Sequence, residues 1–314
     1  MVAMISSRAE LHRLMEKTIN TNLRSMEERG EFADYAVKTN IIESNCSVKD
    51  IPKSFGDYSF ELKPTQDKFL YIMIIKKGTD KIILYLDTYF KRFWKLYNIE
   101  KSLTVNNFIS QFTNNLLKVD SLWMPHQMLN NLEKDYINVG FSIKFKQEIL
   151  EDEELSENDI SQLTMRLWSK GSKPTKGLIN LLEKNNYPTT KTSTRLLNKK
   201  DDEIKFLDEV FFDGKVTVSK GTDIEEHIHF VDDIIDDYSE KMTQIEDNRM
   251  YLESSLGGFK NNGYPFEIKF SKSQSIEKVS DKLINSTSPF RLYTNIQHSL
   301  DPGVMISDEH GSIF

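Results

Sequence analysis

The chain has 314 residues and a formal net charge of -7, and 38% of its residues are hydrophobic, 11% aromatic and 28% charged. This length suits one large or two ordinary domains, and the acidic balance argues against a uniformly basic nucleic-acid binder. The one cysteine, Cys46, excludes an internal disulfide and a cysteine metal cluster and indicates a reducing cytoplasm, while the longest apolar run, Phe69 to Ile75, is far too short to span a bilayer.

The N-terminal part predicts a helix, a hairpin and a helical region. Ser7 and Glu10 form a capping-box pattern at the start of a helix with one apolar face. Two apolar runs within residues 69–86 flank Lys-Lys-Gly-Thr-Asp-Lys and predict a hairpin of two central strands, because neither run alternates. Residues 88–136 are expected to be helical, with Pro125 in the first turn of the last helix.

The next segment predicts a strand followed by a helix. The sequence VGFSIKF, residues 139–145, alternates between apolar and polar positions and is typical of a strand. After an acidic run, Ser156 is a candidate helix cap, and the spacing of Ile160, Leu163 and Leu167 predicts one helical face.

Residues 169–200 have the composition of a basic linker. They begin with a stretch rich in Gly, Ser and Pro, and residues 170–200 contain eight Lys or Arg and one acid. A short helix is predicted around Leu178 to Leu182. The linker divides the chain into an N-terminal α+β region, 1–168, and a C-terminal α+β region, 201–314.

The C-terminal region predicts strands around one long helix. Asp213-Gly214 is a two-residue hairpin turn within EVFFDGKVTV. FEIKF, a helix at 276–284 and FRLYTNI predict a strand–helix–strand unit. The final VMISDEHGSIF segment predicts one more hairpin. Its VMISD arm must pair with another strand, either FRLYTNI or part of a longer chain, because an isolated short hairpin is marginal. Together these elements predict an α+β fold with antiparallel strand pairs packed against helices.

The long helix is expected at residues 223–253. Thr222 and Glu225 form its capping box, and its apolar positions alternate steps of four and three, which is a heptad pattern. The exposed face is heavily acidic. Core packing is the ordinary explanation of such a seam, and a coiled-coil or two-helix interface is the alternative. The candidate partner-binding residues are Ile224, Ile228, Val231, Ile235, Tyr238 and Met242.

His227 and His229 raise the question of a metal site. On a helix, residues two apart point in nearly opposite directions, so the two rings cannot hold one ion. Glu226 and His229 form the E-x-x-H pair found in di-iron bundles, but the sequence contains one copy and it lies off the apolar seam. We therefore predict no metal site.

Glu267 and Lys269 are the weak catalytic candidates. On a strand, their E-x-K spacing places both side chains on one face, as in nucleases that bind Mg²⁺ through carboxylates. Such nucleases also need an Asp on the preceding strand, and the nearest acids upstream belong to the long helix. A chance ion pair across one face explains the pattern equally well.

The basic linker supplies the weak nucleic-acid candidates. Lysine and arginine side chains among Ser, Thr, Asn and Gly suit phosphate contacts, but only Tyr187 is available for stacking. A solvated linker, or docking onto an acidic surface, are the alternatives. The candidates are Lys170, Lys173, Lys176, Lys191 and Arg195.

No motif specifies a reaction, so the leading prediction is a non-catalytic interaction or assembly protein. It would be cytoplasmic, need no cofactor, and use the acidic helix to bind another protein or a second copy of itself. The alternative is a nucleic-acid-binding protein, or a Mg²⁺-dependent nuclease using Glu267 and Lys269. No membrane association is expected.

Overall fold

The computed structural model describes residues 5–29, 36–116, 118–146, 162–169, 171–185, 189–248, 251–255, 258–262, 294–298 and 304–308. The chain divides into two compact units. The first comprises Met1–Glu148 and Glu154–Ile235, and the second comprises Ile149–Glu153 and Asp236–Phe314.

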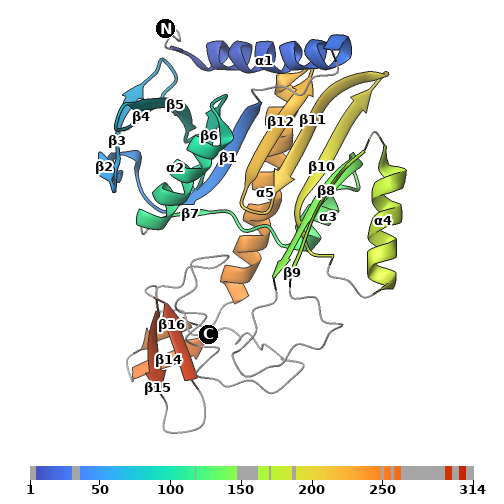
Figure 1. The fold of residues 1–314 in the computed structure, drawn as a ribbon. Coiled ribbons are helices and arrows are strands. Elements are labelled where there is room, and N and C mark those ends of the chain that lie inside the picture. The colour runs from blue at the N-terminus through green and yellow to red at the C-terminus, as the bar shows by residue number, and fades with distance from the viewer. Residues whose placement is uncertain are drawn as a thin grey trace. The chain divides into compact units, whose positions relative to one another are not determined.

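A 12-stranded antiparallel sheet forms the framework of the first unit (Figure 1). Its strand order is β2-β3-β4-β5-β6-β1-β12-β11-β10-β8-β9, and β7 pairs with β1. The strands are β1 (Val37–Ser44), β2 (Ser54–Phe55), β3 (Tyr58–Pro64), β4 (Leu70–Lys77), β5 (Asp80–Asp87), β6 (Phe93–Asn98), β7 (Val119–Ser121), β8 (Ile137–Lys146), β9 (Gln162–Trp168), β10 (Lys191–Lys200), β11 (Glu203–Phe211) and β12 (Lys215–Gly221).

The first half of the sheet packs around helix α2 (Ser102–Asn115), and Val48 of the short 3-10 helix η1 (Val48–Asp50) packs against the same core. Phe108 and Phe112 of α2 are fully buried and stack with ring centroids 5.6 Å apart. The ring of Phe55 in β2 packs against Phe108, with ring centroids 5.7 Å apart. The predicted hairpin is confirmed as β4–β5, and Gly78 in its turn has a φ of +59°, which favours glycine.

Helices α1 (Arg8–Arg29) and α5 (Ile224–Asn248) pack on the strands in the middle of the order. The stacked rings of Phe230 in α5 and Phe206 in β11 have centroids 5.2 Å apart. Arg8 of α1 donates two hydrogen bonds to Asp87 at the end of β5, at 2.6 and 3.1 Å. Lys95 of β6 donates to Asp232 of α5 at 2.6 Å, so both helices are also fixed by charged contacts.

Helices α3 (His126–Leu132) and α4 (Ser172–Lys184) lie at the other end of the sheet. Pro125 immediately precedes α3, close to its predicted place. Leu182 of α4 belongs to a small core with Phe141 and Ile143 of β8, and Leu163, Met165 and Leu167 of β9 pack against that core.

The mixed α+β fold and several elements agree with the sequence predictions. The β11–β12 hairpin forms with Gly214 at a φ of +80°, and β8 covers the predicted strand. The predicted long helix forms as α5, but Asp223 caps it instead of Thr222. The Asp223 carboxylate accepts hydrogen bonds from the backbone N–H groups of Glu225 and Glu226 at 3.1 and 3.2 Å.

Two predicted helices are strands. Residues 93–98, expected to be helical, form β6, whose six residues are all buried, so the continuous apolar pattern gave no strand periodicity. Leu163 and Leu167, expected on a helix, lie on β9, where Met165 completes an alternation of period two.

The predicted basic linker 169–200 is ordered. The short helix expected around Leu178 to Leu182 forms as α4, whereas residues 191–200, expected to be a loop, form β10, which pairs with both β8 and β11. Strands β11 and β12 of the predicted region 201–314 therefore share one sheet with the strands of region 1–168, through the β1–β12 pair and through β10. Its paired backbone and its partners on both sides explain why so polar a segment is ordered.

The second unit contains two hairpins. They are β13 (Tyr251–Ser255) with β14 (Gly258–Asn262), and β15 (Thr294–His298) with β16 (Val304–Asp308). VMISD forms β16 and pairs with β15, which overlaps the last three residues of the predicted FRLYTNI strand and places Ile306 opposite Ile296. The return arm predicted after residue 308 lies outside the described residues. Helix α5 ends at Asn248, not at residue 253. The predicted FEIKF strand and the helix at 276–284 lie outside the described residues.

Candidate functional site

Strand alternation gives the second half of the sheet two different faces. Phe206, Asp208 and Val210 of β11 are buried on the side of α5, as the Phe206 and Asp208 contacts with that helix show. Successive side chains of a strand point to opposite faces. Glu209 and Phe211 therefore belong to the opposite face, where the structure contains a pocket.

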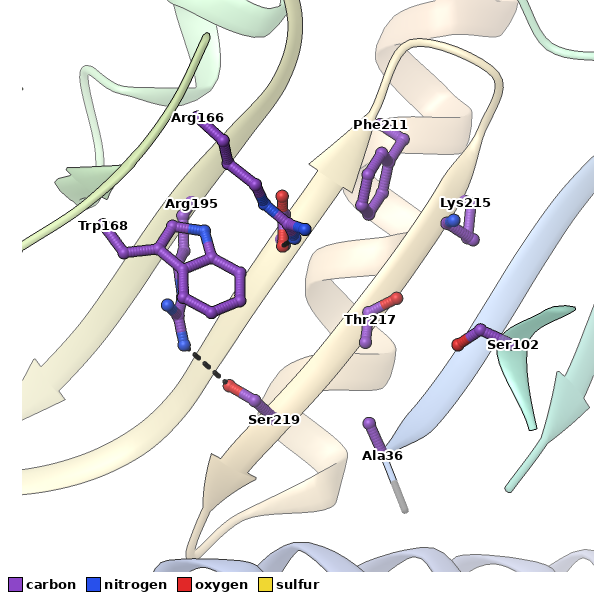
Figure 2. Close-up of a pocket in the computed structure, with 10 residues that line it drawn as sticks. Ala36, Ser102, Arg166, Trp168, Arg195, Phe211, Lys215, Thr217 and Ser219 are labelled. Atoms are coloured by element: carbon purple, nitrogen blue, oxygen red, sulfur yellow. Dashed lines mark hydrogen bonds and ion pairs between the residues drawn. The ribbon is translucent and has the colours of Figure 1, made fainter. Parts of the chain in front are cut away.

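The pocket has a volume of about 550 Å³ and is drawn in Figure 2. It lies over β9, β10, β11 and β12, with α5 on the other side of the strands. Its lining residues are Ala36, Ser102, Arg166, Trp168, Arg195, Glu209, Phe211, Lys215, Thr217 and Ser219. This volume falls within the usual range for a small-molecule site.

Small residues on β8 and β10 create the hollow. Gly140 lies between Trp168 of β9 and Arg195 of β10 in the strand register. Ser142 and Ser193 lie between Arg166 of β9 and Phe211 of β11. Large side chains thus surround a floor of small ones, which leaves space above the sheet.

Trp168 is the exposed aromatic residue of the pocket, with 41% of its surface accessible. The guanidinium carbons of Arg166 and Arg195 lie 4.2 and 4.1 Å from the centroid of its ring. Cations over an aromatic face are attracted by its quadrupole. Trp168 reaches Arg195 across β8 because Gly140 has no side chain in the way.

Glu209 binds Arg166 at the floor of the pocket, and Ser219 binds Arg195. Arg166 Nη2 donates to Glu209 Oε2 at 2.6 Å, and Ser193 Oγ donates to Glu209 Oε1 at 2.9 Å. Arg195 Nη2 donates to Ser219 Oγ at 3.4 Å (Figure 2). Burial lowers the pKa of Arg195, while Glu209 raises that pKa and Arg166 lowers it, but the guanidinium stays charged.

A second aromatic–cation pair lies at β11 and β12. The ammonium group of Lys215 lies 4.0 Å from the centroid of the Phe211 ring. Figure 2 shows Trp168, Arg166 and Arg195 on one side of the pocket and Phe211 and Lys215 on another. The pocket therefore combines three cations and two aromatic rings with one carboxylate, a set that suits an anionic ligand with planar groups.

Lys38 of β1 continues the charged face beside the pocket. It is 3% exposed, and its ammonium donates to the carbonyl oxygens of Ala36 and Glu100 at 3.1 and 2.5 Å. Burial, reinforced by the nearby charge of Lys215, lowers the pKa of Lys38 to about 8, against the partial opposition of Glu100.

A second polar cluster lies behind the sheet, under α5. His227 Nδ1 lies 2.6 Å from Asp208 Oδ2, and His227 Nε2 lies 3.2 Å from Thr39 Oγ1. Burial raises the pKa of the Asp208 carboxyl, and His227 opposes that rise. Although this chain of hydroxyl, imidazole and carboxylate resembles a nucleophile relay, all three residues are 0% exposed. A substrate cannot reach them, so we assign the cluster to the core.

The structure separates the predicted nucleic-acid residues. Arg195 lines the pocket, whereas Lys191 is buried in an ion pair with Glu133. Lys173 and Lys176 are exposed on α4, which packs on the face of β8 and β9 opposite to Arg166 and Trp168. Lys170 lies outside the described residues.

The predicted partner residues of the long helix are mostly internal. Met242 is half-buried, and the other five seam residues are at most 7% exposed: Ile224, Ile228, Val231, Ile235 and Tyr238. His227 is buried and His229 exposed, which agrees with the prediction that these two side chains point in different directions on a helix. Glu226 accepts from Lys200 Nζ at 2.6 Å.

The catalytic candidates Glu267 and Lys269 lie outside the described residues. Within the described ranges, no cluster of three His, Cys, Asp or Glu residues could hold a metal ion. None of the helices in those ranges has both the length and the apolarity needed to cross a bilayer.

Sequence reasoning missed most of the pocket. Arg166 and Trp168 were placed on a helix, and Phe211 and Lys215 were treated only as parts of a hairpin. A usable signal exists: Arg166 and Trp168 flank Leu167, and Lys215, Thr217 and Ser219 alternate with valines. Such alternation predicts a strand with one polar face.

The first unit is thus an α+β structure whose antiparallel sheet carries a pocket suited to ligand binding. The chain belongs to the family of MJECL33-like proteins, whose model matches residues 1–310. It is 24% identical over 334 aligned residues to the protein named Uncharacterized protein MJECL33 of Methanocaldococcus jannaschii, covering 92% of this chain and 78% of the relative. No solved structure matches the chain.

Gly140→Ala tests how the pocket is built. A Cβ at this position would lie 2.5 Å from the Leu167 carbonyl oxygen and 3.0 Å from Trp168 Cδ1. We expect a loss of about 1–3 kcal/mol in the free energy of unfolding and a shifted tryptophan emission. The control is Gly177→Ala in α4, where an added Cβ contacts nothing within 4 Å, and which should stabilise by roughly 0.5–1 kcal/mol. Equal effects of the two variants would contradict this account.

Lys38→Met tests the charge beside the pocket through pH. Because the pKa of Lys38 in the fold, about 8, is below its ordinary value of 10.5, the unfolded chain binds one more proton between these pH values. The free energy of unfolding should therefore rise with pH across that window, by up to about 3 kcal/mol relative to the variant. Urea titrations from pH 7.5 to 10.5 measure it, and a constant difference between the two proteins would refute the assignment.

Proposed function

We propose that this chain binds single-stranded nucleic acid in the pocket of the first unit. The observation that carries the proposal is the exposed ring of Trp168 with two guanidinium groups at 4.1 and 4.2 Å. Proteins that bind single strands combine basic side chains, which contact phosphates, with aromatic rings on which bases stack.

The charges of the pocket support a phosphate ligand. Arg166, Arg195 and Lys215 supply three positive charges, and Glu209 supplies one negative charge. Arginine suits phosphate because its planar guanidinium donates two parallel hydrogen bonds. The net charge of the chain is -7, so the attraction would be local to this face.

The position of the rings favours a single strand over a duplex. Trp168 and Phe211 project from strands of the sheet into a hollow, so a base must leave its stack to reach either ring. Bases of a single strand are free to do this, whereas duplex bases must first be unpaired and unstacked. The hydroxyl group of Thr217 adds a hydrogen-bonding partner for sugar or base, whereas that of Ser219 already donates to the Leu207 carbonyl oxygen and accepts from Arg195.

The proposal concerns binding and assigns no cleavage step. The nuclease interpretation depends on Glu267 and Lys269, whose surroundings the structure does not describe. We also propose a cytoplasmic location, in keeping with a chain whose one cysteine provides no internal disulfide.

A charge-removal series tests the proposal. Arg166→Gln with Lys215→Gln should weaken binding of a fluorescent oligothymidylate at least about tenfold at low salt, because two phosphate contacts are lost. The slope of log affinity against log salt should fall by roughly 1.4, at about 0.7 for each contact. Fluorescence anisotropy at several salt concentrations measures both quantities.

The matched control is Lys173→Gln with Lys176→Gln on α4, which removes the same charge from the opposite face of β8 and β9. It should bind like the wild type. Equal weakening by both pairs would mean that only net charge matters, and no binding by the wild type would end the proposal.

A protein-interaction role is our second candidate, favoured by one observation on α5. Beyond the buried Tyr238 the apolar seam continues through Met242, half-buried, and Ile245, which is 46% exposed. Exposed apolar positions that continue a heptad pattern suit a helical partner. We propose a second copy of the chain as that partner.

Ile245→Glu tests the second candidate. Light scattering over a range of concentrations should show a dimer for the wild type and a monomer for the variant, because a carboxylate is costly to bury in a helix interface. Leu181→Glu on α4 is the control, since Leu181 is 56% exposed and lies off this seam. A wild type that stays monomeric at every concentration would exclude self-association through α5.

A further inference from the structure

We infer that the pocket holds two adjacent nucleotides, with one base on Trp168 and the other on Phe211. This inference rests on the proposed single-strand binding and adds the number and place of the bases. It follows from a repetition in the structure: each ring has its own cation, Arg166 and Arg195 for Trp168 and Lys215 for Phe211.

The spacing of the two rings follows from the strand order. Trp168 is on β9 and Phe211 on β11, three strand positions apart, or about 14 Å between backbones. The Trp168 ring extends over Gly140 until it lies 4.1 Å from the guanidinium of Arg195 on β10. The ring therefore extends toward the strand that carries Phe211, and its row in the strand register meets that strand at Glu209, two residues from Phe211.

The backbone positions between the two rings carry small side chains. Along the register from Arg166 to Phe211 the intervening residues are Ser142 and Ser193. The ion pair of Arg166 with Glu209 spans these strands, and a connecting sugar and phosphate would lie over it. The phosphate would meet the guanidinium of Arg166, which Glu209 orients through a 2.6 Å hydrogen bond.

The pocket is larger than one planar base requires. A mononucleotide on Trp168 would leave Phe211 and Lys215 uncovered within the same cavity of about 550 Å³. A ligand with two bases covers both rings and keeps its linking phosphate over the arginines. Both rings stack any base, so the site would select length over sequence.

The test compares two ligands of equal charge. One is the dinucleotide pTpT, and the other has the same backbone with one thymine replaced by an abasic unit. For the wild type, calorimetry at low salt should give about tenfold tighter binding of pTpT, the gain that stacking of one base typically brings. Thymidine monophosphate gives the affinity of a single unit.

Two variants assign the bases to the rings. Phe211→Leu and Trp168→Leu each keep an apolar side chain and remove one ring, and each should bind pTpT and its abasic partner equally. Their unfolding temperatures identify any loss of fold, and Phe211→Tyr, which keeps a ring, should retain the tenfold preference.

The outcomes separate this inference from the function on which it rests. Equal wild-type affinity for pTpT and its abasic partner would overturn the two-base site and leave single-strand binding intact. A preference that survives in Phe211→Leu would likewise overturn the role of that ring. If no oligothymidylate of any length binds, the proposed function falls together with the inference.

Discussion

The packing of α5 against the back of the sheet is the contact on which the rest of the first unit depends. Ile228, Val231 and Ile235 of the helix are buried, and so are Val216 and Val218 of β12. Because one face of these strands packs in the core and side chains alternate along a strand, every second side chain lies on the opposite face of the sheet. The strand residues that line the pocket are those that alternate with the buried core residues.

Polar contacts within this interface fix the helix in register. His227 contacts Asp208 of β11 and Thr39 of β1 with distances of 2.6 and 3.2 Å, and Asp232 accepts from Lys95 of β6. A buried imidazole between a carboxylate and a hydroxyl tolerates little displacement, because each unpaired group would remain desolvated. Apolar packing brings the helix to the sheet, and these three strands determine where it stops.

The elements that could be predicted from sequence are those with a local signal. The heptad spacing of α5, the Asp213-Gly214 turn and the glycine in the β4–β5 turn each act within a few residues. Strand β9 was mistaken for a helix because Leu163 and Leu167 satisfy both periods. The segment containing β10 was mistaken for a linker because its order comes from pairing with β8 and β11, which no local pattern reveals.

The candidate site was harder to predict than the fold because its parts come from separate strands. Arg166 and Arg195 are distant in sequence from each other and from the hairpin that carries Glu209 and Lys215, and all four meet only through the order β12-β11-β10-β8-β9. Arg195 was identified as a basic residue suited to phosphate, and its place in the pocket agrees with that chemistry. Gly140 could not be identified, since its role is to leave space for a side chain from the next strand.

The place of β9 at the end of the strand order gives the pocket an uneven stability. Arg166 and Trp168 belong to this outermost strand, whereas Glu209, Phe211 and Lys215 belong to strands paired on the inside of the sheet. Local opening of a terminal strand requires less free energy than global unfolding. Each opening of β9 would remove both Arg166 and the Trp168 ring from the pocket. A ligand that binds the complete pocket would therefore also stabilise β9 in its paired state.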